Sequence, residues 1–177
     1  AAALSEEEAV AVWRATKAAV GSEVAVIAGA TSNNHRASLR LTREAVKAGL
    51  DGVLLTVPAY SKPPQAGLVR HFTALADAAE GLPCVLYNIP GRSALNMTAE
   101  TTLRLAEVSN IAGIKESSEM FGQIGEIIAR APEGFRVWSG NDTDTLMVMA
   151  LPLAVAAARA TNWNSDPVDW RVWGLTA

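Results

Sequence analysis

The chain has 177 residues, half of them hydrophobic and 19% charged, and its formal net charge is −3. This composition is typical of one globular domain with a substantial core, and it excludes a disordered or fibrous protein. The chain carries 15 basic and 18 acidic residues, so it lacks the basic excess of nucleic-acid-binding proteins. We therefore expect no nucleic-acid partner.

The single cysteine, Cys84, excludes a disulfide framework and argues against a cysteine-based zinc site. A lone thiol suits a reducing compartment, so a cytoplasmic location is predicted. The first ten residues lack the basic and apolar segments of a secretory signal. The longest nearly apolar run, 146–158, is shorter than the ~20 residues that a membrane span needs, and no membrane partner is expected.

Helical and strand patterns alternate along the chain. The first helix is expected over 5–20, where Ser5 and Glu8 have the spacing of a capping box and Gly21 follows as a stop signal. Further helices are predicted over 36–48, 65–79, 98–108 and 120–131, and one more begins at 143. Strands are predicted over 24–27, 52–57, 83–87, 111–115 and 135–139.

Each of these five strands is followed by a helix, which is the repeat of a βα unit. Continuous apolar strands favour a parallel sheet that is buried on both faces. Two architectures fit this pattern: a doubly wound open sheet and a (β/α)8 TIM barrel. A complete barrel needs ~250 residues, so the chain would hold only about five or six of the eight units.

Polar residues gather in the segments that follow the strands, such as Thr-Ser-Asn-Asn at 31–34 and Tyr-Asn-Ile-Pro-Gly-Arg at 87–92. Barrel enzymes carry their sites at the carboxyl ends of many strands, whereas open sheets concentrate the site at one switch point. We therefore predict a partial α/β barrel over 1–150. The remaining segment, 151–177, holds three of the five tryptophans and no strand–helix alternation, and is interpreted as a divergent tail.

Three side chains that can carry chemistry stand at predicted strand ends: Tyr60, Tyr87 and Lys115. Taken alone, each has an ordinary explanation as an exposed lysine or a core tyrosine. Tyr87 and Lys115, however, fall at equivalent heights on consecutive strands, which lie ~4.8 Å apart in a sheet. A pocket of low polarity favours a neutral amine, which can attack a ketone and form an imine while a phenol moves the protons.

Arg92 lies in a Pro-Gly loop, where its guanidinium is suited to a carboxylate ligand or to a surface salt bridge. Glu116 should point to the face opposite Lys115, so it is not assigned as the base. His35 and His71 are interpreted as surface or interface residues without metal-ligand partners. The acidic turn 141–144 is interpreted as a helix cap, and no metal site is predicted.

Five segments, in this order and at these intervals, form a distinctive pattern: VIAGATSNN, VPAYSKPPQAGLVRHF, LYNIPGRS, IAGIKESS and WSGNDTDTL. On these segments the chain resembles the dihydrodipicolinate synthase and N-acetylneuraminate lyase family of class I aldolases over about 4–150. The resemblance implies a TIM barrel that normally assembles into homotetramers. It also implies no cofactor, because a lysine of the protein itself forms the covalent imine with pyruvate.

The resemblance assigns a role to each candidate residue. Lys115 matches the lysine that forms the Schiff base, and Tyr87 matches the tyrosine that relays protons and positions the keto acid. Tyr60 matches a tyrosine that completes a partner subunit's relay across an interface. Arg92 matches the arginine that binds the carboxylate of aspartate semialdehyde. This arginine favours the branch that condenses pyruvate with L-aspartate semialdehyde in lysine and diaminopimelate biosynthesis.

The chain departs from the family pattern at both ends. The family's Gly-Thr-Thr-Gly-Glu-Ser loop would precede residue 1, and the sequence beyond 150 does not match an eighth strand, so we expect a barrel truncated at both ends. Such a barrel exposes sheet edges and is expected to be marginally stable or to self-associate. Three alternatives stay open: an aldolase for sialic acid or a 2-keto-3-deoxy sugar acid, a catalytically inactive fragment, and a small doubly wound binding domain.

Overall fold

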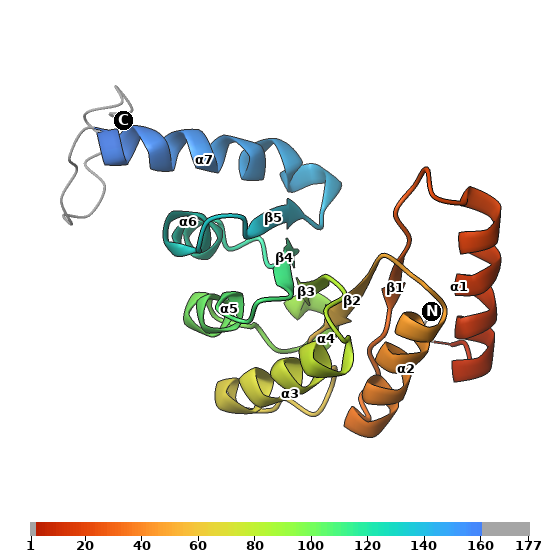
Figure 1. Ribbon diagram of the computed structural model, residues 1–177. Coiled ribbons are helices and arrows are strands. Elements are labelled where there is room, and N and C mark those ends of the chain that lie inside the picture. Colours follow the sequence, from red (N-terminus) through yellow and green to blue (C-terminus); the bar gives the residue numbers. More distant parts are fainter. Residues whose placement is uncertain (1–2, 161–177) are drawn as a thin grey trace.

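The computed structural model describes residues 3–160, in which helices and strands alternate (Figure 1). The strands are β1 (Ile27–Gly29), β2 (Gly52–Thr56), β3 (Cys84–Asn88), β4 (Ile111–Glu116) and β5 (Arg136–Ser139). The helices are α1 (Glu6–Val20), α2 (His35–Lys47), α3 (Gln65–Ala78), α4 (Pro90–Ser93), α5 (Ala99–Ala106), α6 (Phe121–Arg130), the 3-10 turn η1 (Asp142–Asp144) and α7 (Thr145–Ala160).

Local signals fix the helix starts. The predicted capping box of α1 is confirmed, since the Glu8 backbone N–H donates to the Ser5 hydroxyl and the Ser5 N–H donates to the Glu8 carboxylate. Asn34 caps α2 and Thr98 caps α5 through side-chain oxygens that accept from backbone N–H groups of the first turn. Gly21 ends α1 at a positive φ of 62°, which a residue without Cβ adopts at little cost.

The five strands form one parallel sheet in the order β1-β2-β3-β4-β5. A doubly wound sheet reverses its strand order at a switch point, whereas a barrel adds each strand beside the preceding one. The sequential order therefore confirms the predicted partial TIM barrel and overturns the doubly wound alternative. In Figure 1, α3, α5 and α6 are stacked along one side of the sheet, which is the outer side of the barrel wall.

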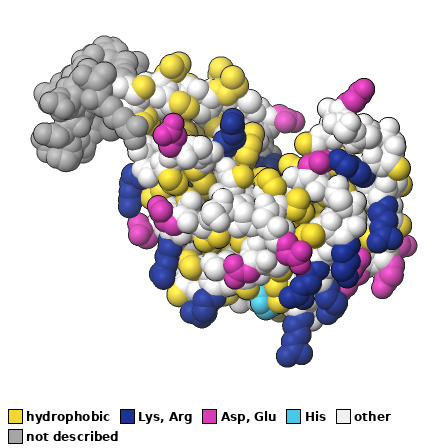
Figure 2. Space-filling view, viewed as in Figure 1, with side chains coloured by type: hydrophobic (Ala, Val, Ile, Leu, Met, Phe, Trp, Pro, Cys, Tyr) yellow, Lys and Arg dark blue, Asp and Glu magenta, His cyan; other side chains and the backbone are white. Residues whose placement is uncertain are grey.

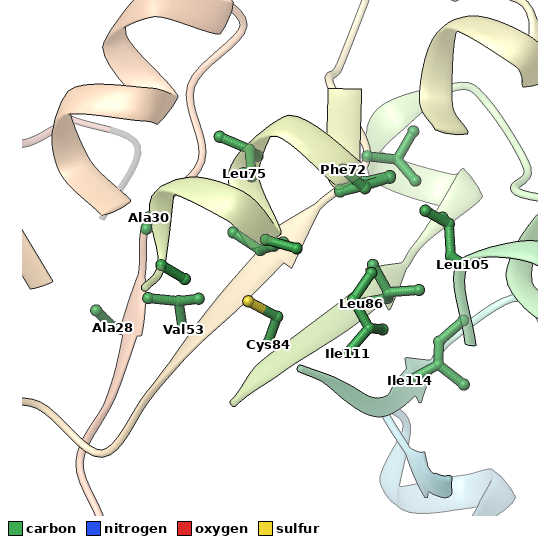
Figure 3. Packing of buried hydrophobic residues seen from close by; sticks show 14 of the residues in the cluster. Ala28, Ala30, Val53, Phe72, Leu75, Cys84, Leu86, Leu105, Ile111 and Ile114 are labelled. Carbon is green, nitrogen blue, oxygen red and sulfur yellow. The ribbon is translucent and has the colours of Figure 1, made fainter. Parts of the chain in front are cut away.

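The hydrophobic core lies between this outer face and the helices (Figure 3). Leu86 of β3 and Ile114 of β4 point into it, and both are fully buried. Phe72 and Leu75 of α3 pack over them in the same cluster. Cys84 lies in this core as well, and burial raises the pKa of its thiol to about 12, so it is suited to packing rather than to nucleophilic chemistry.

The inner face of the sheet is much less covered. Ile27 of β1 is 50% exposed and Trp138 of β5 is 42% exposed, and in β2 the residues Leu54 and Thr56 are only partly buried. The expectation of strands buried on both faces is therefore wrong within residues 3–160. The reason is geometric: helices cover one face, and the other face of a barrel wall is covered only by strands from the opposite side.

Some predicted boundaries also need correction. The first strand begins at Ile27 rather than at Val24, and the Val26 N–H donates instead to the Asp51 carboxylate at 2.7 Å. The short helix α4 begins within the predicted loop 88–92 and ends at Ser93. The helix expected from 143 opens with η1 at Asp142, and α7 then runs to Ala160 with Pro152 inside it.

Residues 161–177 of the predicted tail lie outside the described residues, so the tail stays a prediction. Hydrophobic side chains gather along α7, as Figure 2 shows at the top of the molecule, and Leu146, Met149 and Leu153 are more than two-thirds exposed. Over 3–160, the helices are too short or too polar to traverse a lipid bilayer.

Candidate active site

The predicted neighbourhood of Tyr87 and Lys115 is confirmed. The two residues are register partners in the parallel pair of β3 and β4. Both side chains are partly buried on the inner face, and Nζ of Lys115 lies 4.5 Å from the centroid of the Tyr87 ring. The amine of Lys115 therefore lies over the ring of Tyr87 at the carboxyl end of the sheet, where barrel enzymes carry their reactive groups.

Two glycines leave room for this arrangement. A Cβ on Gly140 would collide with the Ser117 side chain and would lie 3.2 Å from Cε of Lys115. A Cβ on Gly113 would lie 2.6 Å from the indole ring of Trp138. The absence of side chains at these two positions lets Lys115 and Trp138 pack along the inner face of β4.

The same register continues across the sheet. Thr56 pairs with Tyr87, and Lys115 pairs with Trp138, so a row of four inner-face side chains crosses β2 to β5. Sequence reasoning singled out only the two central members. Thr56 and Trp138 stand at equivalent strand ends, and this equivalence is the signal that could have identified them.

Arg92 lies in α4, directly after β3, and its side chain is exposed. Among residues 3–160 no ion pair includes Arg92, so the alternative of a surface salt bridge finds no support. Its guanidinium is available to an anionic ligand.

Tyr60 lies on the loop between β2 and α3, and its side chain is 90% exposed. Its backbone has a positive φ of 68°, and its N–H donates to the Ser93 carbonyl at 3.2 Å. The structure thus ties the Tyr60 loop to the Arg92 segment, but it does not bury the Tyr60 ring against Tyr87 or Lys115.

Glu116 points away from Lys115, as predicted, and is only 2% exposed among the outer helices. The structure also brings together two residues that sequence reasoning treated separately. Nδ1 of His35 lies 2.8 Å from Nδ1 of His71, and burial, together with the neighbouring His35, lowers the pKa of His71 to about 4. The two histidines are 36 residues apart in the sequence, so no local pattern predicts their contact. Within the described residues, no group of three or more potential ligands is placed to hold a metal.

A sequence profile of the dihydrodipicolinate synthetase family matches residues 1–171. The chain is 53% identical over 144 residues to the 4-hydroxy-tetrahydrodipicolinate synthase of Symbiobacterium thermophilum, a match that covers 81% of this chain and 48% of the relative. The crystal structure of the Cyanidioschyzon merolae enzyme with lysine bound matches with a TM-score of 0.83 at 43% identity, over 85% of this chain and 51% of that one.

The chloride-inhibited dihydrodipicolinate synthase of Acinetobacter baumannii, in complex with pyruvate, matches with a TM-score of 0.80 at 36% identity. This match covers 84% of the chain and 51% of the enzyme. The chain therefore spans about half the length of the relatives that it matches.

Proposed function

This chain belongs to the dihydrodipicolinate synthetase family. We propose that it forms the part of the barrel that bears the Schiff-base lysine of a lyase, which condenses pyruvate with L-aspartate semialdehyde. The observation that carries the proposal is the contact of the Lys115 amine with the Tyr87 ring at the carboxyl end of the sheet. Relatives named for this synthase, and one solved with pyruvate, support the choice of keto acid.

In the proposed reaction, the neutral amine of Lys115 attacks the C2 carbonyl carbon of pyruvate. The carbinolamine loses water and leaves a protonated imine, and loss of a methyl proton gives the enamine. The enamine carbon then attacks the aldehyde carbon of the second substrate, whose oxygen takes up a proton, and the imine to Lys115 forms again. The amino group of the second substrate attacks this imine carbon, which closes a ring and releases the Lys115 amine. We assign the transfer of protons at the oxygen atoms to Tyr87, and the contact between its ring and the amine supports this role. Arg92 binds the carboxylate of aspartate semialdehyde.

Tyr60 is proposed to act across a subunit interface, and its exposed side chain supports this role. The proposal includes a homo-oligomer, pyruvate and aspartate semialdehyde as small-molecule partners, no cofactor beyond the imine, and a cytoplasmic location.

One observation favours a second candidate function. The inner face around Tyr87 and Lys115 is only partly covered within residues 3–160, and imine chemistry benefits from a site that excludes water. A catalytically inactive chain that binds a relative is therefore the competing proposal. The sugar-acid aldolases are disfavoured by the arginine at position 92.

The test is incubation of the full chain with pyruvate and borohydride, followed by peptide mass spectrometry. Borohydride delivers hydride to the imine carbon and leaves a stable secondary amine. We expect the adduct on Lys115, its loss in Lys115→Ala, and its retention in the control Lys62→Ala, which removes an exposed lysine. A folded chain without an adduct would favour the inactive alternative.

The second substrate is tested by adding aspartate semialdehyde to the same reaction. We expect its consumption together with pyruvate, and a weaker apparent affinity for it in Arg92→Leu with unchanged trapping of pyruvate. Equal consumption by Arg92→Leu and the wild-type chain would remove Arg92 from the proposal.

A further inference from the structure

A chain of hydrogen-bonded polar side chains lies on the outer face of the sheet, directly behind the candidate site. It connects the start of α3, the ends of β3 and β4, the segment after α4, and the first turn of α6. Its members are Gln65, Asn88, Asn96, Glu116 and Gln123.

Asn88 anchors one end of this polar chain. It is fully buried, its Nδ2 donates to Oδ1 of Asn96 at 2.8 Å, and its Oδ1 accepts from the Met97 N–H at 3.0 Å. Gln65 holds the same segment from the other side, because its Nε2 donates to the Asn96 carbonyl at 2.8 Å. The end of β3 and the start of α3 are thereby fixed to residues 96–97.

Gln123 extends the polar chain to β4. Nδ2 of Asn96 donates to its Oε1 at 2.9 Å, and its Nε2 donates to Oε2 of Glu116 at 3.2 Å. The Ser118 hydroxyl donates to the same carboxyl oxygen at 3.2 Å. Glu116 is thus the only carboxyl group among the five members and the one that joins β4 to the rest.

Each candidate site residue is followed closely by a member of this polar chain. Asn88 comes directly after Tyr87, and Glu116 comes directly after Lys115. Because successive residues of a strand point to opposite faces, the reactive side chain lies inside the barrel wall and its neighbour lies outside. Asn96 lies in the segment that begins with Arg92, so the same bonds hold this segment against the strands.

The surroundings of Glu116 are unusual for a carboxyl group. Its Oε1 is buried and has no hydrogen-bond partner among the described residues, and no ion pair of 3–160 includes it. The groups that face it are uncharged amides and hydroxyls, and burial raises its pKa. The charged side chains of the packed helices α5 and α6 are all exposed: Glu100, Arg104, Glu126 and Arg130.

We propose that Glu116 is a positioning residue, which holds the Lys115 end of β4 in register with the Arg92 segment through Gln123 and Asn96. The expected effect on catalysis rests on the proposed function, whereas the effect on the position of β4 and the Arg92 segment does not. The bond to Gln123 and the bond from Ser118 hold this carboxyl group in one orientation, and its burial makes their loss costly.

Two variants of Glu116 and one control test the proposal. Glu116→Gln keeps a polar group of the same shape that cannot ionise, and Glu116→Leu removes the hydrogen bonds. Glu119→Gln is the control, because Glu119 is exposed and only three residues away. The rate of borohydride trapping of pyruvate at Lys115 is measured at one pH for all chains, together with hydrogen exchange of segments 27–56 and 92–98.

We expect Glu116→Leu to trap pyruvate about tenfold more slowly at saturating pyruvate, with faster exchange in 92–98 and unchanged exchange in 27–56. Glu116→Gln should trap pyruvate at close to the wild-type rate, because its amide oxygen can still accept from Gln123. Glu119→Gln should match the wild-type chain. If Glu116→Leu does not fold, the same two measurements on Gln123→Leu, which removes the partner of Glu116, carry the test.

Two results would overturn the inference. One is trapping of pyruvate by Glu116→Leu at the wild-type rate, and the other is equal acceleration of exchange in both segments, which indicates a general loss of stability. Failure of the proposed function has a different signature. In that case no variant forms an adduct, and the exchange of 92–98 alone decides whether Glu116 positions this segment.

Discussion

The two faces of the sheet differ in how completely the rest of the chain covers their side chains. On the outer face, Leu55, Leu86 and Ile114 are fully buried, and polar side chains pair with one another over several elements. On the inner face, the row around Lys115 is partly exposed and carries the groups that can react. The chain thus builds its own scaffold behind the site, whereas the wall in front of the site is open within residues 3–160.

The largest expected effect compares two leucines of one strand. Leu55 of β2 is fully buried on the outer face, so Leu55→Ala should lower the free energy of unfolding by about 2–5 kcal/mol through lost contacts and a cavity. Leu54 is only partly buried on the inner face, and Leu54→Ala should cost less than half as much. Urea denaturation of both variants measures the difference.

Equal losses of unfolding free energy for Leu55→Ala and Leu54→Ala would contradict this comparison. They would mean that the inner face is as tightly covered in solution as the outer face. Light scattering on the wild-type chain would then identify self-association, which the exposed edges of the sheet also favour.

A smaller effect is expected from pH at the outer helices. The pKa of His71 is lowered in the folded chain to about 4 from an ordinary value of 6.5. As the pH falls, His71 is therefore protonated in the unfolded chain before it is protonated in the folded chain. The contribution of neutral His71 to stability is complete above pH 6.5 and is lost as the pH falls toward 4. We expect a loss of about 1–2 kcal/mol, less than the whole shift implies because the ring is partly exposed.

Denaturation of wild type and His71→Gln at pH 7.5 and pH 4.5 isolates this contribution, since the carboxyl groups titrate equally in both. The variant should lose less stability on acidification. The same acid loss in both chains would contradict the assignment to His71.

The smallest effect concerns α1, which has no fully buried residue. Ser5→Ala removes the capping box and should cost about 1 kcal/mol, with faster hydrogen exchange in the first turn of α1. Ser22→Ala changes an exposed serine outside the helices and should have no comparable effect. A larger loss than for Leu55→Ala would mean that α1 supports the core more than its burial indicates.

The sequence predicts the alternation of elements and the adjacency of Tyr87 and Lys115 because both follow from short-range patterns. Apolar runs mark the strands, and equal positions at the ends of consecutive parallel strands become neighbours. The orientation of Glu116 follows from the same alternation. Arg92 was placed correctly after β3, although α4 was not predicted in its loop.

The remaining features depend on contacts that are distant along the chain. The pairing of His35 with His71 requires α2 to lie beside α3, and the link from Glu116 to Asn96 passes through a glutamine on a third element. The open inner face was missed for a related reason, since an apolar run does not reveal whether one or both faces of a strand are covered.

The most direct test of the account is a crystal structure of the chain after incubation with pyruvate and reduction with borohydride. The account predicts a secondary amine that joins Nζ of Lys115 to the former keto carbon, with Tyr87 beside it and Glu116 still bonded to Gln123 on the opposite face. An adduct on another lysine, or Glu116 turned away from Gln123 with Lys115 still modified, would contradict the division between a reactive inner face and a supporting outer face.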